Sequence, residues 1–313
     1  MKILQCICTA TLLGMMACTN SDQMGLDVDD VQSTSRLQLT ASQRGLAGSV
    51  TSRAADNLYT PTTGFDGTES VEVWFNNTHT TYSVGTPDAT THKSVLSSND
   101  ELRYPGGSGT APLWAVYPAA SGTSGSHTVA YDQTTNANYK ASDLMYARKD
   151  VDLAYKTVAQ NLAFEHQLIK LKMVVTKDAA LSNITKIEIK NVKRTVAITP
   201  ASDALTQGTL SQSTDGHGNN LLIMSGTISD TNPHTYCVLF PAQAWSGTDF
   251  LELTMANNQT YIFTLEKDDW QNGSEYLLNL VVYDSYLGAK VSVTDWLTCD
   301  EVPVVDTGDT SGN

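Results

Sequence analysis

The sequence predicts an all-β protein with two domains, and three observations support that prediction. Short runs of alternating apolar and polar residues, typical of half-buried strands, recur along the chain. Ser, Thr, Gly and Asn crowd the intervals between these runs, as expected of frequent turns. The 313 residues exceed the length of one typical domain, which is about 100–150 residues. We therefore expect two hydrophobic cores.

Several runs show the alternation clearly, and each is predicted to be a strand. Their apolar positions are Leu37/Leu39, Val71/Val73/Phe75, Ile187/Ile189, Leu251/Leu253/Met255, Tyr261/Phe263/Leu265, Leu278/Leu280/Val282 and Val291/Val293. The intervening side chains are predicted to face solvent. These are Glu72, Lys186, Glu188, Lys190, Glu252 and Thr264. The run Leu162–Leu171 fits a helix or a strand, and we favour a strand.

A change in composition indicates where the two domains meet. The stretch Asp143–Lys156 is charged, and an apolar run begins at Val158. We expect the boundary near residue 157, within about ten residues. The expected domains are then 54–157 and 158–313.

The first residues have the order of a bacterial secretory leader. A positive charge and a short apolar stretch, Ile3–Met16, come before a small residue and Cys18. Leu13–Cys18 resembles a lipobox, so we expect a signal peptide at 1–17 and acylation of Cys18. Ordinary secretion is the alternative. The acidic segment Thr19–Gln32 is predicted to be a flexible tether.

The five cysteines leave little material for disulfides. Cys6 and Cys8 depart with the leader, and Cys18 would carry lipid. Cys237 lies in an apolar run and is predicted to be a buried small hydrophobe. Pairing with Cys299, in the polar tail, is the alternative.

Composition and motifs argue against several function classes. The formal net charge of −14 is unfavourable for binding nucleic acid or an anionic membrane surface. The sequence contains no His-Glu-x-x-His, no phosphate-binding glycine loop, no Gly-x-Ser-x-Gly and no Cys-x-x-Cys. The six histidines lack ligand spacing. We expect no enzymatic activity, no metal and no cofactor.

Two weaker alternatives concern catalysis and calcium. A hydrolase would pair His127 or His217 with a serine, but it would also need an orienting group and an oxyanion hole. Asp268-Asp269 and Asp300-Glu301 are candidate calcium ligands. Solvated turn carboxylates explain these acidic pairs better.

Three arginines fall early in the mature chain. Arg36, Arg44 and Arg53 surround the first alternating run and the small-residue stretch Thr51–Ala55. An exposed stretch of this kind is accessible to a trypsin-like protease. Composition alone favours ordinary surface arginines.

Motifs in a fixed order along nearly the whole chain resemble those of the fimbrillins, the subunits of type V pili of Gram-negative anaerobes. The lipobox comes first, followed by the acidic tether and the strand Leu37–Thr40. The later motifs are Thr51–Ala54, Val71–Phe75, Leu113–Pro118, Asp143–Ala147, Phe164–Leu171, Phe240-Pro241, Gly273–Val282 and Val291–Trp296. None is catalytic, and their order indicates the family.

The resemblance implies two β-sandwich domains of transthyretin-like character and export as a lipoprotein of the outer membrane, exposed on the cell surface in a fimbrium. It also implies that an arginine-specific protease removes residues 18–53, including the strand with Leu37 and Leu39. The matching scissile bond is Arg53-Ala54, and Arg44-Gly45 is the alternative.

The resemblance further implies that a strand from another fimbrillin subunit, identical or different, fills the groove left by the removed strand. The candidate donor strand lies at the C-terminus. Its apolar residues are Val291, Val293, Trp296, Val302 and Val304. Pro303 would cost one ladder hydrogen bond and suits an edge position.

A monomeric, glycan-binding surface lipoprotein is the alternative function. Aromatic side chains on a loop face would stack on sugars in such a protein. The available tryptophans are Trp74, Trp114, Trp245, Trp270 and Trp296. Tryptophan is more often part of a core.

Overall fold

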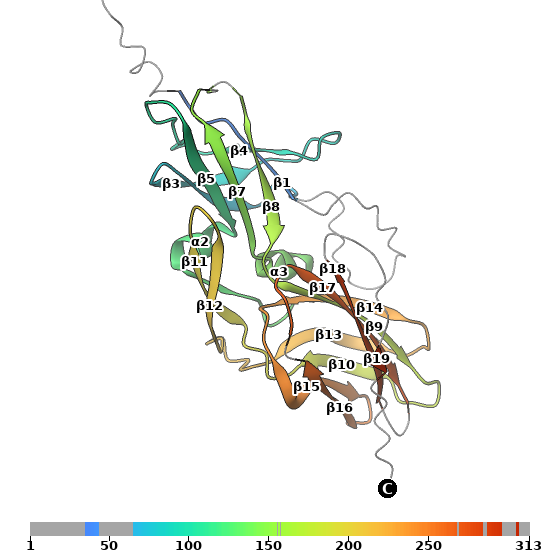
Figure 1. Cartoon of the computed structure of the whole chain (residues 1–313). Helices are drawn as coiled ribbons and strands as arrows, with labels where there is room; N and C mark the ends of the chain where they lie inside the picture. Colours follow the sequence, from blue (N-terminus) through green and yellow to red (C-terminus); the bar gives the residue numbers. More distant parts are fainter. Residues whose placement is uncertain are drawn as a thin grey trace, which may run out of the picture.

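A computed structural model describes residues 35–43, 65–154, 156, 158–267, 269–283, 287–295 and 305–306, the last two segments through their backbone alone. The all-β prediction is confirmed, because strands dominate the described residues. The described helices, α2 (Ala119–Ser124) and α3 (Asn136–Ser142), are short. No described helix combines the length and the apolarity needed to cross a membrane. Figure 1 shows two bodies of strands placed end to end.

The first body, the N-terminal barrel, is a closed sheet in the order β1-β4-β3-β2-β5-β7-β8. Its strands are β1 (Leu39–Gln43), β2 (Ser70–Phe75), β3 (Thr78–Val84), β4 (Ser94–Ser97), β5 (Thr110–Tyr117), β7 (Met145–Asp152) and β8 (Gln160–His166). Two seams are short: β3 meets β4 only at Ser83-Val84, and β7 meets β8 only at Met145-Tyr146. The barrel is therefore close to a sandwich in which β4-β1-β8 faces β3-β2-β5-β7.

The second body, the C-terminal sandwich, contains sheets in the orders β13-β10-β15-β16 and β14-β9-β17-β18-β19. Its strands are β9 (Ile169–Lys177), β10 (Ile184–Ile189), β13 (Leu221–Ile228), β14 (His234–Phe240), β15 (Trp245–Met255), β16 (Thr260–Lys267), β17 (Ser274–Val282), β18 (Leu287–Asp295) and β19 (Val305–Asp306). Buried aromatics lie in its core: Trp245 contacts Phe240, Phe250 and Trp270.

A third sheet joins the two halves of the chain. It has the order β12-β11-β6 and consists of β6 (Ser126–Thr128), β11 (Thr195–Pro200) and β12 (Leu205–Ser211). An apolar cluster combines Val116 and Leu144 from the first half with Leu168 and Leu239 from the second. The Gln133 side chain also donates to the Leu239 carbonyl and accepts from the Leu239 amide, both at 2.8 Å.

The chain leaves the barrel at the upper end of the expected interval, which was within about ten residues of residue 157. Strand β8 pairs within the barrel, and β9 opens the sandwich, so the change falls between His166 and Ile169. The charged residues that suggested a linker, Arg148–Asp150, are the exposed part of β7. Leu162–Leu171 is extended, as predicted, but it is divided between two strands.

Two carboxylates that were predicted to be exposed are buried. Glu72 is 2% exposed and accepts a 2.6 Å hydrogen bond from Thr81, and its Oε1 lies 2.5 Å from His79 Nδ1. Glu188 is 3% exposed and accepts a 2.6 Å bond from Tyr131. Helix α2 and the segment around Tyr131 pack over these faces. Alternation within a strand does not reveal such tertiary cover.

Candidate functional site: the strand that closes the barrel

Strand β1 lies in a slot between two strands that are remote in sequence. It runs antiparallel to β4, with Leu39 opposite Leu96 and Ala41 opposite Ser94. On its other side it runs parallel to β8, from Leu39 opposite Gln160 to Gln43 opposite Phe164. Because β1 alone joins β4 to β8, it closes the barrel.

The side chains of β1 and its preceding residues alternate between the core and solvent. Leu37 and Leu39 are each 3% exposed, and Ala41 is fully buried. Arg36 and Gln38 point outward and are exposed. The inward residues belong to the barrel core, which also contains Leu96, Leu102, Tyr104, Leu162 and Phe164. The slot is thus an apolar groove with an outer rim of polar groups.

Backbone hydrogen bonds fix the strand along both rims. Leu37 N donates to Leu102 O at 2.9 Å, and Tyr104 N donates to Ser35 O at 3.0 Å. Gln160 N donates to Gln38 O at 2.8 Å. These bonds are independent of side-chain identity. A different strand could make them equally well.

Asn161 of β8 adds side-chain contacts on the outer face. Its Oδ1 accepts from Thr40 Oγ1 at 3.1 Å, and its Nδ2 donates to Ser42 Oγ at 3.0 Å. Asn161 and Thr40 are 121 positions apart in the sequence. Sequence reasoning missed Asn161, because nothing in its local pattern indicates a partner so far away.

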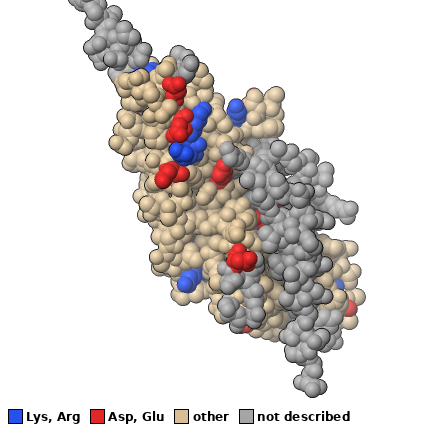
Figure 2. Space-filling model, in the orientation of Figure 1, with Lys and Arg blue, Asp and Glu red and all other residues tan. Residues whose placement is uncertain are grey.

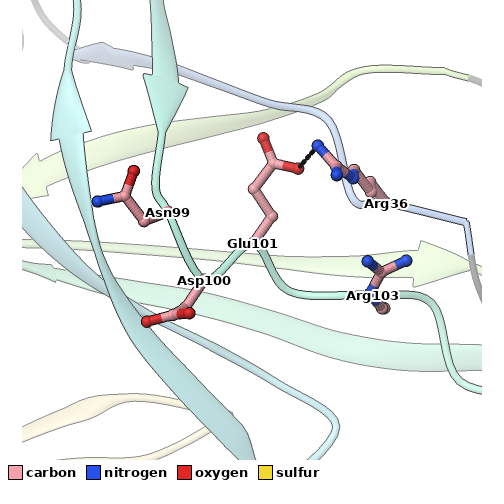
Figure 3. Close-up of a pocket in the computed structure, with 5 residues that line it drawn as sticks. All are labelled: Arg36, Asn99, Asp100, Glu101 and Arg103. Atoms are coloured by element: carbon pink, nitrogen blue, oxygen red, sulfur yellow. Dashed lines mark ion pairs between the residues drawn. The ribbon is translucent and has the colours of Figure 1, made fainter.

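A charged mouth lies where β1 enters the slot. Arg36 Nη1 is 2.9 Å from Glu101 Oε2. A cavity of about 290 Å³ is lined by Arg36, Asn99, Asp100, Glu101 and Arg103, and Figure 3 shows the Arg36–Glu101 pair among these residues. Figure 2 shows acidic and basic side chains side by side over this end of the molecule.

The loop that carries Glu101 is held by the opposite sheet. Tyr82 of β3 accepts a 2.8 Å hydrogen bond from Leu102 N. Burial raises the pKa of the Tyr82 hydroxyl above its usual range. The hydroxyl therefore stays neutral, and it anchors the segment whose carbonyl receives Leu37 N.

The other predicted site residues lie in different places. Cys18, Arg44, Arg53-Ala54, Trp296, Val302 and Val304 are outside the described residues. Val291 and Val293 are in β18, where their backbones pair with Leu278 and Tyr276 of β17. Strand β19 returns to pair with β18 at Val291. Leu37 and Leu39 are therefore in a different body from Val291 and Val293.

Candidate sites of other kinds find little support in the described part of the chain. No three metal-ligating side chains gather there. Burial raises the pKa of the Cys237 thiol to about 11, so this cysteine is a poor nucleophile. Its possible partner Cys299 is outside the described residues.

His127 and the described tryptophans have structural surroundings. His127 is 2% exposed and lies 2.8 Å from Ser121 Oγ and 2.9 Å from the Ser142 carbonyl, and burial lowers its pKa. Trp245 and Trp270 lie in the sandwich core, where sugars have no access. Trp74 and Trp114 stack on each other at 4.1 Å between ring centroids.

These features define a class of protein: all-β, with a first barrel that is closed by the first described strand. The chain belongs to the fimbrillin-like family, whose model matches residues 52–296. The match begins after β1 and extends one residue beyond β18. Family membership supports the role of a fimbrial subunit at the cell surface.

Two solved structures share the fold, and a third resembles the chain more weakly. A proposed cell adhesion protein from Bacteroides uniformis is 17% identical, with a TM-score of 0.58, over 83% of this chain and 98% of that one. Another from Bacteroides ovatus is 14% identical, with a TM-score of 0.56, over 87% and 97%. The C-terminally truncated tip fimbrial protein Mfa3 of Porphyromonas gingivalis is 12% identical, with a TM-score of 0.45, over 83% and 99%. No curated protein matches the chain.

Proposed function

We propose that this protein is a structural subunit of a cell-surface fimbria that assembles by protease-gated donor-strand exchange and supports adhesion. The observation behind this proposal is that β1, the first described strand, closes the barrel. Its only covalent link to the other described strands is the segment between Gln43 and Phe65. Both candidate cleavage sites, Arg44-Gly45 and Arg53-Ala54, lie in that segment. One cut there makes β1 a separate peptide.

Loss of β1 would create a surface that favours association. The strands β4 and β8 would expose unpaired backbone groups, and the core would lose the cover of Leu37, Leu39 and Ala41. Unpaired strand edges readily accept another strand. A strand from a neighbouring subunit would restore the backbone bonds and place alternate side chains in the groove.

The remaining parts of the chain complete this proposal. The leader and Cys18 deliver the subunit to the outer membrane as an acylated lipoprotein, and an arginine-specific protease releases β1 at the cell surface. The C-terminal residues Val291, Val293, Trp296, Val302 and Val304 form the strand that this chain donates to the next subunit. Support for this donor is the location of β18 near a sheet edge: among the described strands, its outer neighbour is the two-residue β19.

The test is to follow the subunit in fimbriae sheared from cells. Wild-type protein should appear in high-mass polymers with Ala54 as its first residue. The Arg44→Ala/Arg53→Ala variant should fold but stay membrane-bound and unassembled, because acylated Cys18 remains attached and β1 still occupies the slot. Arg36→Ala is the matched control and should assemble like wild type. Normal polymer from the double variant would refute protease gating, and a monomeric wild-type protein would refute the fimbrial role.

A further inference from the structure

One position in the slot has an unsatisfied polar group. Ser94 of β4 is 1% exposed, and its hydroxyl has no hydrogen-bond partner among the described residues. Ser94 alternates with Leu96 on the inward face of β4, and it lies directly opposite Ala41. A buried hydroxyl without a partner is unfavourable. Strand β1 therefore leaves the Ser94 hydroxyl without a hydrogen bond.

The geometry specifies which side chain would correct the defect. Side chains directly opposite each other in an antiparallel pair have Cβ atoms about 4.5–5.5 Å apart, and Ser or Thr pairs at this spacing form hydrogen bonds. The methyl group of Ala41 cannot bond to Ser94. Space is limited as well, because Ala41 is fully buried in the core. A small hydroxyl side chain satisfies both conditions.

Strand β1 and the residues just before it indicate which other side chains the slot accepts. A basic residue, Arg36, meets Glu101 at the mouth, and aliphatic residues follow at Leu37 and Leu39. We propose that the slot selects a strand with this pattern followed by Ser or Thr in the place of Ala41. This inference rests on the proposed strand exchange and names the class of partner that the slot accepts.

The C-terminal stretches of this chain depart from that pattern at the same point. In the direction of β1, Lys290-Val291-Ser292-Val293-Thr294 matches Arg36–Thr40 in type, but Asp295 then takes the place of Ala41. The stretch Glu301–Asp306 also places an aspartate there, and it starts with an acidic residue facing Glu101. One hydroxyl cannot compensate for a buried carboxylate charge. The preferred donor is thus a different subunit rather than a second copy of this chain.

Peptide exchange on the full chain tests this selectivity. A sequence-specific protease site in place of residues 47–52 allows β1 to be cut free from the rest, and mass spectrometry after gel filtration measures release of the N-terminal fragment. The probes are peptides of Ser35–Gln43 with Ala, Ser or Asp at position 41. We expect Ser to exchange about three- to tenfold better than Ala and Asp to exchange at least about tenfold worse than Ser.

A matched slot variant isolates the proposed contact. In Ser94→Ala protein, the advantage of the Ser peptide over the Ala peptide should disappear. The chain's own peptide Ala289–Trp296 should exchange poorly, and its Asp295→Ser form should exchange at least about tenfold better. Equal exchange of Ser and Ala peptides, or better exchange of Asp, would overturn the inference; the second result would make a second copy the occupant.

A measurement on the uncut protein distinguishes a failure of the proposed strand exchange from a failure of the proposed slot selectivity. In the intact chain, Ala41→Ser should increase hydrogen-exchange protection of Leu39–Gln43 about three- to tenfold, and only when Ser94 is present. If no peptide exchanges but this protection appears, strand exchange fails and the selectivity of the slot stands. If peptides exchange and protection does not depend on Ser94, the selectivity fails and strand exchange stands.

Discussion

The barrel and the sandwich each contain a parallel pair of strands that are distant in sequence, but the two pairs differ in how firmly they are held. In the sandwich, β17 pairs with β9 from Glu275 to Val282 and with β18 along its whole length. In the barrel, β1 meets β4 only from Leu39 to Ala41 and β8 from Leu39 to Gln43. Parallel pairing between distant strands therefore holds an extensively paired strand, β17, in the sandwich and a less extensively paired strand, β1, in the barrel.

Position along the chain increases the difference. Strand β17 lies between described strands on both sides, whereas β1 is the first described strand. Removing β17 would divide the five-stranded sheet and take Tyr276, Leu278, Leu280 and Val282, each at most 2% exposed, out of the core. Removing β1 opens one slot and leaves the order β4-β3-β2-β5-β7-β8 intact.

The largest expected effect comes from placing a charge in each pair. Leu280→Asp should prevent the sandwich from folding, because an unpaired carboxylate would be buried in its core. Leu39→Asp should release β1 while the sandwich remains folded. Hydrogen exchange measured peptide by peptide should show loss of protection in β9 and β17 only for Leu280→Asp. Global loss of protection in Leu39→Asp would show that β1 is integral to the whole fold.

A smaller change at the same position measures how much β1 stabilises the barrel. Leu39→Ala should lower the free energy of unfolding by about 2–5 kcal/mol, because it leaves a cavity in the barrel core. Gln38→Ala, on the exposed face, should change it by less than about 0.5 kcal/mol. Urea denaturation followed by circular dichroism gives both values. Equal effects of the two variants would contradict the burial of the inward face.

The contact between the two halves of the chain should depend on pH. Arg194 is fully buried, donates to Val129 O at 3.1 Å and pairs with Asp215. The hydrogen bond from Arg194 lowers the pKa of Asp215 from 3.8 to about 2. A lowered pKa in the folded state means that the stabilisation is present above about pH 4 and is lost as the pH falls toward 2.

Asp215→Asn tests this contact. The variant should lose about 1–2 kcal/mol at pH 7, a modest value because the Asp215 side chain is 38% exposed and screened by water. Its stability should also fall less steeply than that of wild type between pH 4 and pH 2. Thermal unfolding across this range provides the comparison. Identical slopes for the two proteins would show that Asp215 does not contribute the acid-sensitive step.

The smallest expected effect concerns the mouth of the slot. The Arg36 side chain is 67% exposed, so its pair with Glu101 should contribute only about 0.2–1 kcal/mol. Arg36→Ala should therefore lower the melting temperature by only a few degrees, and high salt should reduce the difference further. If Arg36→Ala lost more stability than Leu39→Ala, the ion pair would contribute more to the stability of the barrel than the buried leucine does.

Local pattern was sufficient to predict the strands but not their neighbours. The alternation at Leu37 and Leu39 indicated a strand with one buried face, and both side chains are buried. Its partners β4 and β8 could not be inferred, because backbone pairing carries no mark in the sequence. The break between β8 and β9 was missed for a related reason: both halves of Leu162–Leu171 are apolar although they enter different sheets.

Of the candidate site, only the residues of the removable strand, Leu37 and Leu39, could be predicted from the sequence. Nothing around Ser94, Glu101 or Asn161 distinguishes these residues from other polar surface residues before the fold brings them to β1. Glu72 and Glu188 illustrate the opposite error, since a carboxylate between apolar neighbours suggests exposure. Their burial depends on Thr81 and Tyr131, which supply hydrogen bonds from other segments. Tertiary contacts decide such cases.

The location of β1 between β4 and β8 also has a mechanical consequence. Any strand in this slot is held along both edges by hydrogen bonds that lie across its axis. Tension along a polymer of subunits would pull such a strand lengthwise, so all of these bonds would resist together rather than open one after another. Resistance to force is set by the rate of unfolding and not by equilibrium stability. A short strand in shear can thus hold a filament that a longer strand, peeled from one end, would not.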